Sequence, residues 1–197
     1  MAVISVPTIP AKSYSLSLNR ADQPLQFMNG SVVIIAPAIA FWSVRVPFKV
    51  LQETNAKAWA AALAQLSKLS NTFYFAVPDY SGPRNGYAGA DPLVNGAGQL
   101  GTTLAVDGVT ISTTILLPGD YIEVGGEFKI VTNTVTSNVS GQASINFEPA
   151  LRTAPATDST VDIQSPVITM RLAQSLMTLD VEILSLYNMA LEAVEHY

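Results

Sequence analysis

Apolar and polar residues alternate in the N-terminal part of the chain, as half-buried β-strands require. The segment "SYSLSL" (13–18) places Tyr14, Leu16 and Leu18 on one face and serines on the other. This pattern predicts a strand with one face packed against a core.

The segment "VVIIAPAIAFW" (32–42) is apolar throughout and is interrupted by Pro37. At 11 residues it is too short to cross a bilayer, which takes about 20 apolar residues in a helix. We therefore predict a pair of buried strands here and no insertion into a membrane.

A second alternating segment, "FWSVRVPFKV" (41–50), sets Trp42 and Val44 against Ser43 and Arg45. One face of this strand is expected to meet water or a partner, while the other packs on the core. A further strand is predicted over "NTFYFAVPDY" (71–80).

One helix stands out between these strands, in "TNAKAWAAALAQLSKL" (54–69). Trp59, Ala62, Leu63 and Leu66 recur at helical spacing, and alanine, a strong helix former, fills much of the rest. With Thr54 or Asn55 as the N-cap, the pattern predicts a helix over about 55–69 that packs on a sheet.

The composition changes over residues 81–101, "SGPRNGYAGADPLVNGAGQLG", which hold six glycines and two prolines. This stretch reads as a loop and as a boundary between two folding units. Because long loops in compact proteins are usually functional, we expect it to contact a neighbouring subunit.

Six β-branched segments follow the glycine-rich loop. They cover residues 102–108, 109–115, 120–126, 127–136, 143–151 and 166–173. Asp107-Gly108 and Gly125-Gly126 stand at two-residue hairpin spacing, and the whole predicts a small barrel or sandwich. The glycines of "PGDYIEVGGEFKIV" (118–131) match neither a phosphate loop nor a dinucleotide fingerprint, so they are predicted to form a hairpin corner.

The C-terminal piece, "SLMTLDVEILSLYNMALEAVEHY", allows two interpretations. Leucines and isoleucine at three- or four-residue spacing favour a helix over residues 176–187. Alternation favours a strand over residues 188–195. The sequence thus predicts a mainly β, α+β fold with one or two helices.

Apolar residues make up 49% of the chain and charged residues only 13%, about half of ordinary usage. This is an unusual surface for a free monomer, and it favours a subunit whose surface is covered by other subunits. The net charge is −5 without any basic run, which argues against sequence-specific nucleic-acid binding. The start of the chain lacks the pattern of a signal peptide.

Candidate chemistry is sparse. The chain has no cysteine and a single histidine, His196, so no catalytic triad or zinc site is expected. The carboxylate pairs Asp107 with Asp120 and Glu123 with Glu127 allow glycosidase chemistry, but a solvated hairpin face explains the second pair more simply. We expect neither an enzyme nor a metal or cofactor site.

Five residues are candidate contacts between subunits or with a partner: Tyr80, Arg84, Tyr87, Trp42 and Arg45. Tyr80, Arg84 and Tyr87 lie in or next to the glycine-rich loop. They are of the types enriched at protein interfaces, and they could alternatively bind a saccharide.

The order of segments resembles the distal tail proteins found at the tail tip of long-tailed bacteriophages. The resemblance covers roughly residues 55–172 and is carried by a Gly-Asp segment followed by a Pro-x-Leu-Arg segment. The matching positions are Gly119, Asp120, Val124, Gly125, Gly141, Ala143, Ile145, Phe147, Pro149, Leu151 and Arg152.

The resemblance implies a ring-forming β-sandwich with one helix over residues 1–95 and 171–197, and an inserted small all-β domain over residues 96–170. It implies a structural virion protein, assembled in the host cytoplasm, whose ring (commonly a hexamer) joins the tail tube to the tip or baseplate and lets DNA pass. The implied partners are copies of the chain and the tail tube, hub and tape measure proteins. The family offers no catalytic residue.

Two alternatives remain open at this point. The first is another minor tail, tail-tube or terminator protein, which would share the ring symmetry. The second is a tail-associated β-sandwich module that binds a host-surface saccharide through Tyr80, Tyr87 or Tyr121.

Overall fold

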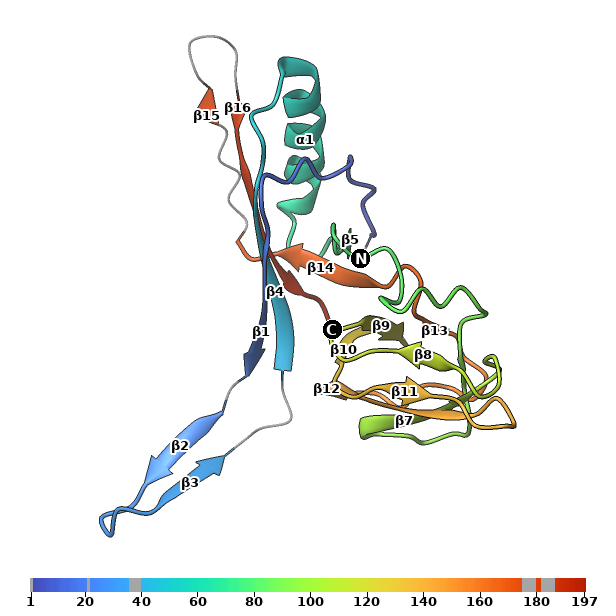
Figure 1. The fold of residues 1–197 in the computed structure, drawn as a ribbon. Helices are drawn as coiled ribbons and strands as arrows, with labels where there is room; N and C mark the ends of the chain where they lie inside the picture. Colours follow the sequence, from blue (N-terminus) through green and yellow to red (C-terminus); the bar gives the residue numbers. More distant parts are fainter. Residues whose placement is uncertain (1, 21, 36–39, 175–179, 182–186) are drawn as a thin grey trace. The chain divides into compact units, whose positions relative to one another are not determined.

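The computed structural model describes residues 2–20, 22–35, 40–174, 180–181 and 187–197, which Figure 1 draws in colour. The chain is mainly β, with a nearly closed six-stranded barrel-like sheet and one helix in this described part. The predicted mainly β fold with a helix is confirmed.

The chain divides into two compact units. Unit 1 comprises Met1–Arg20, Phe41–Phe75 and Thr169–Tyr197, and unit 2 comprises Ala21–Ala40 and Ala76–Ile168. The sequence-based prediction starts the inserted domain at residue 96, whereas unit 2 takes up the chain again at Ala76. The glycine-rich segment belongs to unit 2 because Tyr87 and Val94 are buried in the core of the barrel.

The sheet of unit 1 has five strands that come from distant parts of the sequence. Their order is β1 (Ser15–Arg20), β4 (Ala40–Pro47), β17 (Ala190–Glu195), β14 (Val167–Leu172) and β5 (Phe73–Ala76). In the register of β4 and β17, Val44 pairs with Ala193 and Val46 with Leu191. All four of these side chains are buried, as the alternation along the strand predicts.

Helix α1 (Glu53–Leu66) supplies the other large apolar surface of unit 1. The predicted stripe is confirmed, since Trp59, Ala62, Leu63 and Leu66 are all buried. The helix begins two residues earlier and ends three residues earlier than predicted, and its N-cap is Gln52 without a side-chain capping bond. The ring of Trp59 packs on that of Phe48, with centroids 4.7 Å apart.

Strands β2 (Gln23–Gln26) and β3 (Val32–Ile35) form a hairpin. The prediction of buried strands is wrong for the apolar residues of this hairpin. Its strands pair with each other in register, with Gln26 opposite Val32. Val32 is 56% exposed and Val33 is 49% exposed. Apolar composition alone predicted burial, but the hairpin pairs with no third strand in the described part of the chain. Residues 36–39 of the predicted segment lie outside the described residues.

Unit 2 contains a six-stranded sheet that closes almost completely on itself. Its order is β13 (Val161–Asp162), β9 (Tyr121–Val124), β10 (Glu127–Val131), β12 (Ala143–Leu151), β7 (Gly101–Asp107) and β6 (Leu93–Val94). The first and last members approach each other, because Val94 N donates to Ser159 O and Val161 N donates to Pro92 O. Strands β8 (Thr114–Leu116) and β11 (Val135–Thr136) form a separate pair. Closure of this kind removes most free strand edges.

The two predicted hairpin corners have different outcomes. Gly125 and Gly126 both adopt positive φ, 59° and 79°, and connect β9 to β10 with Val124 opposite Glu127. This is the backbone of a two-residue primed turn, and the prediction is confirmed. The Asp107-Gly108 prediction is wrong, because β7 pairs with β6 and β12 and the next strand begins only at Thr114.

The C-terminal strand β17 confirms the strand predicted over residues 188–195. Most of the predicted helix 176–187 lies outside the described residues. Its three described positions are in strands rather than in a helix, with β15 (Asp180–Val181) paired to β16 (Tyr187–Asn188).

Candidate functional site

Two of the five predicted contact residues are buried inside their own unit. Trp42 is 4% exposed in unit 1, and Tyr87 is 9% exposed in the core of the barrel. The phenol of Tyr87 lies 3.2 Å from Ala90 O and accepts a hydrogen bond from Thr110 N at 3.3 Å. Gly89 lies so close that a Cβ there would collide with this phenol. Neither ring is therefore presented to a partner, and the interpretation of these two residues as surface contacts is wrong for this chain.

Arg45 does lie on the surface of unit 1. Its side chain is 72% exposed and pairs with Glu192, which stands opposite it on β17, with Nε 3.1 Å from Oε1. An exposed pair of this kind contributes about 0–1 kcal/mol to stability. Arg45 is thus accessible for a contact, and that role stays a prediction.

Tyr80 and Arg84 line a groove in unit 2 together with Tyr121. The volume of this groove is about 460 Å³, and Asp79, Ser81 and the backbone of Gly82 also contribute to it. We call it the Tyr80 groove. The chain turns at two places here, since Tyr80 N donates to Val77 O and Gly86 N donates to Pro83 O. These turns follow β5 directly and place the side chains of residues 79–84 beside the start of β9.

Arg84 is anchored at the groove by a buried carboxylate. Its Nε lies 3.0 Å from Oδ1 of Asp120, whose side chain is fully buried, and its backbone N–H donates to the same oxygen at 3.3 Å. The other oxygen of Asp120 accepts from Leu117 N at 2.7 Å. Arg84 Nη2 also donates to Pro118 O. The arginine side chain nevertheless remains 57% exposed, so part of the guanidinium faces solvent.

Tyr80 and Tyr121, which line the groove, form a continuous ring contact with the buried Phe128. Tyr80 meets Tyr121 edge to face, with centroids 5.4 Å apart, and Tyr121 stacks on the buried ring of Phe128 at 5.0 Å. The Tyr80 hydroxyl lies 3.1 Å from Tyr121 O and 3.0 Å from Ile163 O. Burial is the main reason that the pKa of each tyrosine is raised above its ordinary value, so both phenols are neutral at physiological pH.

Glu123 and Glu127, singled out in the sequence, have different hydrogen-bond partners. Glu127 is buried and bonds Lys129 Nζ at 2.6 Å, while its oxygens also accept from the backbone N–H groups of Arg152 and Thr153. Glu123 instead accepts from Val167 N at 3.1 Å. The interpretation of the pair as a solvated hairpin face is wrong for Glu127, which is 6% exposed. Among the described residues, no three His, Asp or Glu side chains are arranged to hold a metal ion.

Two residues of the family-like motif, Asp120 and Arg152, form ion pairs within unit 2. Asp120 anchors Arg84 and ties Leu117, as described above. Arg152 places its Nε 3.5 Å from Glu127 and so joins the buried Glu127–Lys129 pair, in which Lys129 is fully buried. The contacts of Asp120 and Arg152 thus hold segments of unit 2 together.

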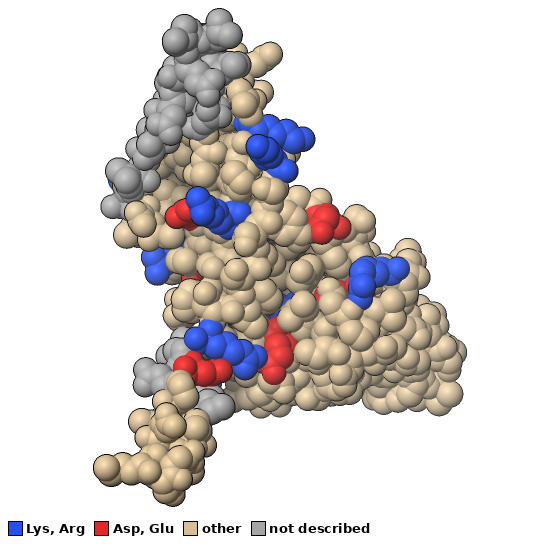
Figure 2. Space-filling model, turned by 60° about the vertical axis from the view of Figure 1, so that its left-hand side comes forward, with Lys and Arg blue, Asp and Glu red and all other residues tan. Residues whose placement is uncertain are grey.

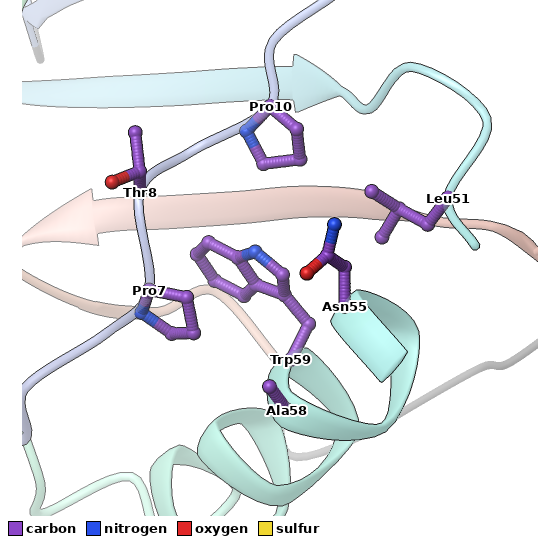
Figure 3. A pocket seen from close by; sticks show the side chains of 7 residues that line it. All are labelled: Pro7, Thr8, Pro10, Leu51, Asn55, Ala58 and Trp59. Atoms are coloured by element: carbon purple, nitrogen blue, oxygen red, sulfur yellow. The ribbon is translucent and has the colours of Figure 1, made fainter. Parts of the chain in front are cut away.

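A second hollow, of about 260 Å³, lies in unit 1 between the N-terminal segment and helix α1. Figure 3 shows the indole of Trp59 between Pro7 and Asn55, with Pro10 and Leu51 nearby. Trp59 itself is 1% exposed, and the lining combines prolines and aliphatic side chains with the polar Thr8 and Asn55. It carries no charged side chain that would orient a ligand.

The β2–β3 hairpin carries the largest group of exposed apolar side chains on consecutive elements. These are Leu25, Phe27, Met28, Val32 and Val33, and we call them the hairpin surface. Residues 23–44 contain no charged residue, and the hairpin is correspondingly free of red and blue in Figure 2. Sequence reasoning missed this surface, although the uncharged run with an Asn-Gly turn was a usable signal.

Comparison of the sequence with protein-family models gives no match, and comparison with curated proteins gives none either. Within the residues that the structure describes, no helix has the length and apolarity needed to cross a membrane.

Proposed function

We propose that this chain is a structural protein of a bacteriophage tail, forming a ring at the distal end of the tail that joins the tail tube to the tip or baseplate. The observation that carries the proposal is the hairpin surface, whose five apolar side chains are each about half exposed or more. The resemblance of the Gly-Asp and Pro-x-Leu-Arg segments to distal tail proteins supplies the biological context.

An isolated two-stranded hairpin is only marginally stable in water, and exposed apolar residues on it add an unfavourable surface. Met28 at the tip is fully exposed, and Phe27 beside it is 52% exposed. Burial of such side chains against another molecule contributes about 1.5–3 kcal/mol for each large one. A hairpin of this composition is therefore suited to lie against a partner.

A ring provides that partner without a second kind of protein. In a closed ring, one surface of each copy meets a different surface of the next copy, so every hairpin is covered. The net charge of −5 also suits a lumen through which DNA passes without adhering. The chain's low content of charged residues agrees with a surface that is largely covered in the assembly.

The proposal is tested by native mass spectrometry and negative-stain imaging of the purified chain over a range of micromolar concentrations. We expect a closed ring, and we expect Met28→Lys combined with Val33→Lys to abolish it without unfolding the units. Val139→Lys is the matched control, because Val139 is 81% exposed but lies on another loop. A chain that stays monomeric with a hairpin surface open to covalent labelling, alone and in isolated tails, would contradict the proposal.

A further inference from the structure

Three Asn-Gly pairs occur in the chain: Asn29-Gly30, Asn85-Gly86 and Asn95-Gly96. In such a pair the backbone nitrogen of the glycine can attack the side-chain Cγ of the asparagine, because glycine has no Cβ to hinder the approach. In a folded protein the reaction depends on how easily the local backbone moves and on what the asparagine amide is bonded to. The pairs differ in both respects.

Asn29-Gly30 lies at the exposed tip of the β2–β3 hairpin. Gly30 has φ 82° and closes the turn by donating its N–H to Phe27 O at 2.9 Å. A Cβ on Gly30 would meet no atom within 4 Å beyond its chain neighbours. The hairpin pairs with no third strand in the described residues, and isolated hairpins are only marginally stable in water. The turn therefore opens at a low cost in free energy.

The side-chain amide of Asn29 is arranged for attack at Cγ. Its Oδ1 accepts from Ser31 N at 3.0 Å and from Ser31 Oγ at 2.7 Å. When Cγ is attacked, negative charge develops on this oxygen, and donors at such distances stabilise it as in an oxyanion hole. The Nδ2 atom, which has to leave, donates to no group in the part of the chain that the structure describes.

The other pairs are held by contacts within unit 2. Asn85 Nδ2, the leaving group there, donates to Thr114 O at 2.7 Å. The backbone carbonyls of Asn95 and Gly96 both accept from Gln99 Nε2, at 3.0 and 3.1 Å. Ring closure at either pair requires the backbone or the amide to leave these contacts, which raises the barrier relative to Asn29.

We propose that Asn29-Gly30 modifies itself, converting Asn29 to aspartate or isoaspartate without an enzyme. Gly30 N gives its proton to solvent and forms a bond to Asn29 Cγ, the Cγ–Nδ2 bond breaks, and Nδ2 takes up protons from water and leaves as ammonia. Water then adds to either carbonyl carbon of the succinimide ring. Opening at Cγ yields aspartate, and opening at the backbone carbonyl yields isoaspartate. An uncharged amide thus becomes a carboxylate.

The new carboxylate changes the hairpin surface. Residues 23–44 contain no charged residue, and the neighbouring Met28 is fully exposed. Burial of an unpaired carboxylate is costly, so a modified hairpin resists being covered by another molecule. The consequence rests on the ring proposed above: a modified chain is excluded from the ring, and an assembled chain is protected because its hairpin is covered.

The chemistry is tested by incubating the intact chain at neutral and at mildly alkaline pH, with each asparagine site assigned by peptide-fragmentation mass spectrometry. We expect Asn29 to convert about tenfold or more faster than Asn85 and Asn95, because the contacts of these two add to the barrier. The rate should rise with pH, because the glycine nitrogen must lose its proton. The self-modification is overturned if Asn29 converts no faster than the other two.

Ser31→Ala tests the assignment of Ser31 as a positioning residue. The change removes one of the donors to Asn29 Oδ1 and should slow conversion at Asn29 by about threefold or more, while Asn85 and Asn95 keep their rates. An equal or faster rate at Asn29 would overturn this assignment. Asn29→Gln, whose longer side chain would have to close a larger ring, should stay unmodified.

Asn29→Asp imitates the product and tests the consequence for assembly. It should fail to form the ring in native mass spectrometry, while Asn29→Gln should assemble like the unaltered chain. Asn138→Asp is the matched control, because Asn138 is exposed on another loop and its Oδ1 accepts from Ser140 N, which aspartate also allows. Equal assembly of Asn29→Asp and Asn138→Asp would overturn the exclusion. If the unaltered chain forms no ring, the proposed function and the exclusion both fail, whereas the conversion rates still decide the self-modification.

Discussion

Arg84 places its guanidinium Nε 3.0 Å from Oδ1 of Asp120, and it does so from the surface, while the carboxylate is fully buried. A buried charge is tolerated when it is paired and its remaining lone pairs are bonded. Asp120 meets this requirement because Leu117 N, Arg84 N and Arg84 Nε all donate to it. The pair links the segment that follows β5 to the segment that precedes β9.

Replacement of Asp120 by alanine should destabilise unit 2 strongly. The change leaves Leu117 N without its acceptor and removes the partner of Arg84, and we expect a loss of about 3 kcal/mol. This value is near the lower end of the range for breaking a buried ion pair, because the arginine side chain is more than half exposed. Urea denaturation followed by circular dichroism measures it.

Asp107→Ala is the control for this experiment, because Asp107 is the other carboxylate of the pair that the sequence singled out. It lies at the end of β7 and is only partly buried. We expect it to change stability by no more than about 0.5 kcal/mol. Equal effects of the two substitutions would show that the Arg84–Asp120 contact contributes nothing specific.

The buried pair of Glu127 and Lys129 predicts a loss of stability in acid. Burial by itself raises the pKa of Glu127, but hydrogen bonds from Lys129 Nζ and Arg152 N outweigh it and hold the pKa below the ordinary value. A carboxyl whose pKa is lowered in the folded state contributes fully to folding stability above its unfolded-state pKa, about 4.3 for glutamate. This contribution is lost as the pH falls through the pKa of the folded state. The urea concentration at the unfolding midpoint should therefore decrease as the pH is lowered from neutral to about 3.

Two variants separate the contributions to this acid profile. Glu127→Gln should lower stability at neutral pH by about 3 kcal/mol, because Lys129 is left charged and fully buried. The stability of this variant should also depend less on pH in acid. Glu123 acts in the opposite direction, since burial raises its pKa, so protonation in acid relieves a cost. Glu123→Gln should therefore steepen the acid loss. A profile that is the same in both variants would exclude these residues as its cause.

Removal of the indole of Trp59 should test the core of unit 1. Trp59 is 1% exposed and contacts Phe48, and Trp59→Ala leaves a large cavity. The expected cost is about 3–5 kcal/mol, which is enough to unfold a marginal unit. Gln65→Ala on the exposed face of the same helix should change the thermal midpoint little. A Trp59→Ala chain that melts with the control would mean that the helix does not stabilise unit 1.

Substitutions of Gly125 in the Gly125-Gly126 turn should change stability through backbone conformation alone. Gly125 has φ 59° and its nearest neighbour, Pro155, leaves room for a Cβ at 3.8 Å. Gly125→Val should cost about 1–2 kcal/mol because a β-branched residue resists this conformation. Gly125→Asn should be close to neutral, since Asn-Gly is the preferred pair in such turns. Chemical denaturation of both variants provides the comparison, and equal losses would exclude backbone strain as the cause.

Local patterns predicted the elements whose side chains alternate or recur regularly. The alternation over β4 placed Val44 and Val46 inside, and the helical stripe placed Trp59 and Leu63 inside. The same reasoning failed for Val32 and Val33, because an apolar strand is buried only if another element covers it. Whether such an element exists is decided by pairing between distant segments, which periodicity does not reveal.

The candidate site was predicted in part. The residue types of Tyr80, Arg84 and Tyr121 were recognised as suited to recognition, and the structure brings these three to one groove. Tyr87, of the same type and in the same segment, is instead bonded inside the barrel. No local signal distinguishes the two tyrosines, because the burial of each depends on which distant residues it packs against.

By itself, the sequence determined the mainly β character of the chain, the face that each regular strand buries, the helix and the glycine turn between β9 and β10. These properties depend on residues that are close together in the chain. The backbone geometry of a strand or helix sets the direction in which each of their side chains points. Only the tertiary structure decided that the barrel closes between Val94 and Ser159, that Asp120 is buried beneath Arg84, and that the β2–β3 hairpin stays exposed. Each of these depends on contacts between segments far apart in the chain, where the free energy of packing selects one arrangement among many that the local pattern allows.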